Sequence, residues 1–127
     1  MEFETVNEKE IKELLKSEKE PEIFVFAGRF YSYKGELEKA EDYLEKALNL
    51  FLKRWGKPSI SDVSFLSFSY EETKFFQAVR ELAIVKMKLG KFLESLVYMN
   101  KILEFDPDDR VIKRLKNRLE SLTGVSF

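Results

Sequence analysis

Apolar residues recur at intervals of three and four along most of this chain, and single glycines separate the segments that carry the pattern. This spacing puts apolar side chains on one face of an α-helix, whereas a half-buried strand needs strict alternation. The chain has only 5 Gly and 3 Pro, which are too few turn formers for a many-stranded sheet. A length of 127 residues is also too short for two independent cores. The sequence therefore predicts one all-α domain.

The periodicity predicts six helices with identifiable ends. They run over residues 8–16, 21–34, 36–55, 70–89, 91–105 and 107–122. Asn7 and Ser69 each stand three residues before a glutamate, the spacing of a capping box that satisfies backbone N–H groups of the first turn. For the last helix we expect Asp106 as the capping residue and Pro107 in the first turn, where a proline loses no hydrogen bond.

Composition excludes several kinds of chemistry. The chain has no Cys and no His, so it lacks disulfides, the usual zinc ligands and a His or Cys catalyst. Its glycines are isolated, so no phosphate-binding glycine loop is present, and we expect no enzyme activity and no cofactor. A net charge of −1, an acidic start and the lack of a long apolar run favour a cytoplasmic protein without membrane contact. Lys and Glu dominate the charged residues, as in heat-adapted proteins, although an ordinary helical surface has the same bias.

Two segments of the chain resemble each other when Gly35 is aligned with Gly90. The first reads FVFAGRFYSYKGELEKAEDYLEKALNL, and the second reads VRELAIVKMKLGKFLESLVYMNKILEF. Each segment predicts a helix, a tight glycine turn and a second helix. Helical hairpins of this kind bury their apolar faces by stacking on their neighbours.

This pattern resembles the tetratricopeptide repeat family, which has aromatic and small residues at fixed positions around a glycine turn. The first repeat, over residues 21–54, has matching residue types at Phe24, Ala27, Gly28, Tyr31, Gly35, Leu37, Ala40, Leu44 and Ala47. The second, over residues 76–109, has them at Val79, Leu82, Ala83, Gly90, Phe92, Ser95, Met99 and Pro107. It departs from the pattern at Lys86, where an aromatic is expected, and at Ile102, where a small residue is expected. Both departures weaken the expectation of close helix packing in the second repeat.

The resemblance implies a right-handed superhelix of antiparallel helical hairpins. Residues 55–75 are then an insertion between the repeats, and the helix over 107–122 caps the last apolar face. An ordinary antiparallel bundle is the alternative. The insertion is rich in serine but also contains Trp55, Phe65, Phe68 and Tyr70. If exposed, these aromatic residues would mark an interface, but we expect most of them to be buried.

The resemblance also implies a function, because the first helices of such repeats line a groove that holds a peptide or a partner helix. By position, the groove residues are Val25, Arg29, Ser32, Tyr33, Gln77, Arg80, Ile84, Met87 and Lys88. The cations among them could meet acidic groups on a partner, and solvation or local pairing is the alternative. Val25 and Arg29 replace the Lys and Asn of the family's chaperone-binding members, so we expect no chaperone-tail binding.

The last helix carries the main charge feature of the chain. Its basic face consists of Arg110, Lys113, Arg114 and Arg118. These residues could contact nucleic acid or an acidic partner, but nucleic-acid binding usually needs a broader basic surface. We therefore expect an adaptor or scaffold that binds another protein or peptide. Nucleic-acid association is one alternative, and a homo-oligomer is another, because two repeats are fewer than the roughly three usually needed for stability.

Overall fold

The computed structural model describes residues 6–17, 19–64 and 69–126. These residues form six α-helices and one short 3-10 helix, and they contain no strand. The elements are α1 (Glu8–Ser17), α2 (Pro21–Tyr33), α3 (Leu37–Trp55), η1 (Ile60–Asp62), α4 (Tyr70–Lys88), α5 (Phe92–Phe105) and α6 (Arg110–Thr123). The all-α fold expected from the periodicity is confirmed.

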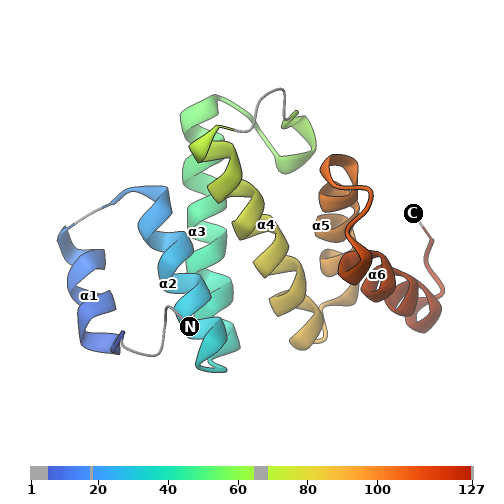
Figure 1. Ribbon diagram of the computed structural model, residues 1–127, viewed down its shortest axis with the longest axis horizontal. Helices are drawn as coiled ribbons and strands as arrows, with labels where there is room; N and C mark the ends of the chain where they lie inside the picture. The colour runs from blue at the N-terminus through green and yellow to red at the C-terminus, as the bar shows by residue number, and fades with distance from the viewer. Residues whose placement is uncertain (1–5, 18, 65–68, 127) are drawn as a thin grey trace.

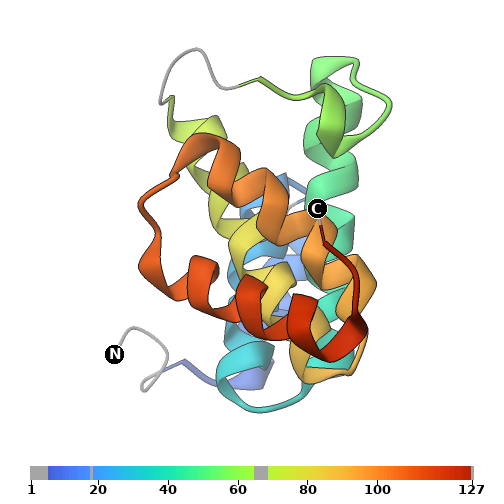
Figure 2. The same ribbon diagram turned by 90° about the vertical axis from the view of Figure 1, so that its right-hand side faces the viewer.

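The helices follow one another across the molecule in sequence order, with α1 and α6 at opposite ends (Figure 1). α2 packs against α3, and α4 packs against α5, so each pair forms a helical hairpin. α3 contacts α4 and thereby joins the two hairpins. α6 packs on α5 and lies across that end of the molecule (Figure 2). This is the layered arrangement of a helical repeat protein.

The turns of the two hairpins have the same construction. Gly35 has φ +81° and Gly90 has φ +79°, a left-handed backbone that glycine adopts at low cost. In the first turn the N–H of Glu36 donates to the carbonyl of Tyr31 at 2.9 Å. In the second turn the N–H of Lys91 donates to the carbonyl of Lys86, also at 2.9 Å. Both helices therefore end in the same glycine motif, as the alignment of the two segments predicts.

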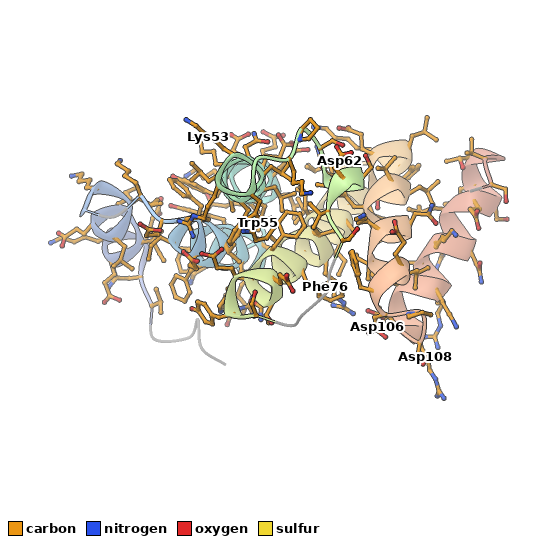
Figure 3. The ribbon with its side chains drawn as sticks, turned by 90° about the horizontal axis from the view of Figure 1, so that it is seen from above. Lys53, Trp55, Asp62, Phe76, Asp106 and Asp108 are labelled. Carbon is orange, nitrogen blue, oxygen red and sulfur yellow. The ribbon has the colours of Figure 1, made fainter. Side chains whose placement is uncertain are left out.

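The core is continuous from one hairpin to the next, and aromatic rings connect α3 with α4. The ring of Trp55 lies 5.3 Å from that of Phe51 and 5.1 Å from that of Phe75. In Figure 3, Trp55 lies among the side chains near the centre of the molecule, whereas Lys53 points away from it. The Trp55 indole N–H donates to Glu71 at 3.0 Å, which satisfies its polar group.

The start of α6 differs from the sequence prediction. We expected Asp106 to cap this helix, but the capping residue is Asp109, whose side chain accepts from the N–H of Ile112 at 3.1 Å. Asp106 instead begins a turn, because its carbonyl accepts from the N–H of Asp109 at 3.2 Å. Pro107 lies within that turn rather than in the helix. The two predicted caps at Asn7 and Ser69 are both present.

The described part of the insertion packs on the domain. Val63 is buried, and Ile60 and Trp55 are half-buried against the core. Tyr70, in contrast, is 67% exposed, although we expected most of the aromatic residues of the insertion to be buried. Phe65 and Phe68 lie outside the described residues.

Candidate protein-interaction site

The predicted groove residues come from two neighbouring helices, α2 and α4. On α2 they are three and four residues apart, and on α4 they also recur at helical spacing, so each set shares one face of its helix. We call this surface the α2–α4 face. Its residues are Arg29, Ser32, Tyr33, Gln77, Arg80, Ile84, Met87 and Lys88.

The α2–α4 face combines apolar and cationic side chains that reach solvent. Tyr33 is 42% exposed, Lys88 is exposed, and Ile84 and Met87 are half-buried. Arg29 is also half-buried. A half-buried apolar side chain that keeps part of its surface in water can bury the rest against a partner.

Val25 does not belong to this surface. Its side chain is only 2% exposed and is part of the core, so the placement of Val25 in the groove is wrong. The reason is that α2 is contacted by α1, α3 and α4, and these neighbours leave it less open surface than the resemblance implied.

Arg80 is paired within the chain. Its Nε lies 3.0 Å from Oδ2 of Asp109, the residue that caps α6. Burial alone would raise the pKa of Asp109, but hydrogen bonds from the Arg80 guanidinium and from the N–H of Ile112 outweigh it and lower this pKa. Arg80 therefore links α4 to the start of α6. For this cation, the alternative of local pairing within the chain holds.

Lys86 occupies a site that sequence reasoning did not identify. It stands where the repeat pattern expects an aromatic, yet it is only 3% exposed. Its Nζ lies 2.7 Å from Glu41, 2.5 Å from Glu45 and 3.1 Å from Glu94. Lys91 also binds Glu41, at 2.8 Å. We call these five residues the Lys86 cluster.

The Lys86 cluster joins three helices, because its carboxylates come from α3 and α5 and its buried lysine comes from α4. Burial alone would lower the pKa of Lys86, but its hydrogen bonds to the three glutamates outweigh burial and raise it. The ammonium therefore remains charged at neutral pH. The signal in the sequence was a lysine within an apolar helix, but spacing alone could not identify its partners.

The basic face predicted for α6 is exposed. Arg110, Lys113, Arg114 and Arg118 all reach solvent, while Ile112 and Leu119 are buried on the other side of the helix. Lys116 is separate from this group, because its Nζ donates to Asn100 on α5 at 3.0 Å. The amphipathic pattern of the last helix is thus confirmed.

Residues 21–53 match the family model of the tetratricopeptide repeat. No curated protein and no solved structure is significantly similar to the chain. The match covers α2 and nearly all of α3, the hairpin whose residues resemble this family most closely. Such repeats are typically non-catalytic modules for protein–protein interaction.

Within residues 6–17, 19–64 and 69–126, no group of three or more His, Cys, Asp or Glu side chains is arranged to hold a metal ion. No helix in the same part of the chain is long and apolar enough to cross a membrane.

Proposed function

We propose, from the tetratricopeptide repeat over residues 21–53, that this chain is an adaptor or scaffold that binds a peptide or partner helix on the α2–α4 face. The observation that carries the proposal is the contact between α2 and α4, with Tyr33 exposed on α2, Lys88 exposed on α4, and Ile84 and Met87 half-buried on α4. Tyr33, Ile84 and Met87 supply the apolar contacts. A preformed surface of this kind favours binding because little ordering is needed.

Charge sets the chemistry of the proposed partner. Lys88, one of the predicted groove residues, is exposed at the end of α4. An ammonium attracts a carboxylate as a point charge. The partner segment is therefore acidic as well as apolar. Arg80 makes no contribution here, because its charge is satisfied by Asp109.

A matched pair of variants tests the α2–α4 face. The Tyr33→Ala, Lys88→Glu variant changes two exposed residues of the face. The Leu93→Ala, Lys53→Glu variant makes the same kinds of change at exposed positions outside it. Each tagged protein is incubated with nuclease-treated lysate of the source organism, and retained proteins are quantified by mass spectrometry. We expect a stoichiometric partner that the control variant retains and the face variant loses. Equal retention by both variants would contradict the proposal.

The exposed basic face of α6 favours a second candidate function, association with nucleic acid. Four cations on one helix can contact phosphates, and such binding falls steeply with salt. The test is charge reversal at Arg114 and Arg118 with binding to a labelled RNA and DNA pool measured at low salt. Loss of measurable binding in the reversed variant would support this candidate. Absence of binding by the unaltered protein would exclude it.

A further inference from the structure

A pocket of about 390 Å³ lies between α3 and α5, away from the α2–α4 face. The helices contribute Glu45 and Asn49 from α3, and Glu94 and Tyr98 from α5. Residues 58–60 form a third wall. None of the lining residues comes from α2 or α4, so this α3–α5 pocket is separate from the surface in the proposed function.

The third wall comes from the insertion between the two hairpins. Ser59 donates to Asp62 at 2.9 Å and shares a second hydrogen bond with Ser61, which closes a compact turn. Val63, directly after this turn, is buried and anchors it to the core. In Figure 3 the turn that contains Asp62 lies between α3 and α5. The insertion therefore builds an ordered wall over the gap between these helices.

The polar groups of the pocket are mainly acceptors. Glu45 and Glu94 each use Oε1 to bind Lys86, at 2.5 Å and 3.1 Å. Within the described residues, Oε2 of both glutamates accepts no hydrogen bond. Asn49 and Tyr98 likewise form no side-chain hydrogen bond in that part of the chain. A ligand would therefore meet two carboxylate oxygens, an amide and a phenol.

The charge of the neighbouring cluster also favours a cation. Two lysines, Lys86 and Lys91, face three glutamates, Glu41, Glu45 and Glu94, so the cluster carries one excess negative charge. Glu41 is the buried member and binds both lysines, which leaves the excess on the two glutamates at the pocket. A hydrogen-bond donor with a positive charge would complete this arrangement.

The rest of the lining is apolar and suits the stem of such a cation. Leu48 and Leu52 supply α3 surface, and Pro58 and Ile60 supply the wall from the insertion. The Tyr98 ring can also attract a cation over its face. Long cationic side chains bury their methylene groups on surfaces of this kind and keep the charged head among acceptors.

We propose that the α3–α5 pocket binds an alkylammonium group carried on an apolar stem. The source is either a free diamine or a lysine side chain of a partner protein, because both present the same chemistry. The negative pair of Glu45 and Glu94 binds the charged head, and the apolar wall of the insertion contacts the stem.

Amide-detected NMR titration of the full chain tests this proposal. The probes are 1,4-diaminobutane and an acetylated, amidated Gly-Lys-Gly peptide, with 1,4-butanediol as the neutral control. We expect saturable shifts at the Asn49 side-chain amide and at the backbone amides of Ser59 and Ile60. The tighter of the two amines identifies the source. Absence of saturable shifts for both amines, or equal shifts with the diol, would overturn the proposal.

Three variants separate charge from shape. Glu94→Gln removes one pocket carboxylate but leaves Lys86 paired with Glu41 and Glu45, so the fold is retained. It should weaken amine binding about tenfold or more, because a charge-assisted hydrogen bond is lost.

Asn49 is exposed, and Asn49→Phe should fill the pocket and abolish amine binding. Glu104→Gln, an exposed change on the same helix outside the pocket, is the matched control. Unchanged affinity in both Glu94→Gln and Asn49→Phe would overturn the proposal.

Discussion

The Lys86 ammonium is nearly out of contact with water, and its three carboxylate partners compensate the lost hydration. Taking a charge out of water costs several kcal/mol, so a buried lysine is tolerated only where its partners are well placed. Its nearest partner, Glu41, is also buried and has a lowered pKa, because the hydrogen bonds from Lys86 and Lys91 outweigh the effect of burial. This cluster therefore fixes how closely α3, α4 and α5 approach one another.

Substitution of Lys86 should therefore lower the free energy of unfolding. Lys86→Met keeps the length of the side chain but leaves Glu41 buried with Lys91 alone, so we expect the free energy of unfolding to fall by about 3 kcal/mol. Lys91→Met is the control, because Lys91 is 44% exposed and Glu41 keeps Lys86 as its partner, so we expect a much smaller loss. Urea unfolding measures both. Equal losses in the two variants would contradict the buried-charge account.

Gly28 lies where α2 crosses close to α3. A Cβ at this position would lie 2.5 Å from Cγ of Leu44 and 3.3 Å from its backbone nitrogen. Gly28→Ala should destabilise the protein by about 1–3 kcal/mol through overpacking, although alanine is the better helix former. The double variant Gly28→Ala, Leu44→Ala should lose less free energy of unfolding than the sum of the losses in the two single variants. Thermal unfolding of the three variants checks this, and a stabilised Gly28→Ala variant would show that the helices can separate at low cost.

At the scale of elements, local signals predicted where most helices begin and end. The glycine turns at 35 and 90 and the caps at Asn7 and Ser69 depend only on nearby residues, and they are present as expected. The start of α6 could not be predicted in this way. Three acidic residues, at 106, 108 and 109, compete to cap it, and a contact with the distant Arg80 stabilises Asp109.

This attachment of α6 should depend on pH. The pKa of Asp109 is lowered in the folded protein from an ordinary value near 3.8. Its contribution to stability is therefore complete above that value and is lost as the pH falls through the lowered folded pKa. Asp109→Asn keeps a capping side chain but removes the charge, so the variant should be less stable than the unaltered protein at pH 7.

Thermal unfolding followed from pH 7 into the acid range measures this effect. The difference in unfolding temperature between the unaltered protein and the Asp109→Asn variant should shrink as Asp109 becomes protonated. Asp108→Asn, at the exposed neighbouring position, is the control and should leave the pH profile unchanged. A difference that stays constant with pH would show that the Arg80 pair contributes nothing through charge.

At the scale of the whole molecule, the sequence predicted the order and type of the helices but not which surfaces remain open. Val25 was assigned to the groove, yet it is buried, because the packing of α1 and α4 around α2 is a long-range property. The Lys86 cluster and the α3–α5 pocket also join residues far apart in the chain. Periodicity identifies the buried face of each helix, but it does not identify its neighbours.

If a partner binds the α2–α4 face, as we propose, site-specific photo-crosslinking should capture it there. A photoreactive phenylalanine analogue replaces Tyr33 on this face in one protein and Leu93 on α5 in another, since both positions are exposed. After irradiation in lysate of the source organism, we expect one discrete crosslinked protein from position 33 and none from position 93. Crosslinking of the same protein from position 93 alone would contradict binding on the α2–α4 face and place the partner on another face.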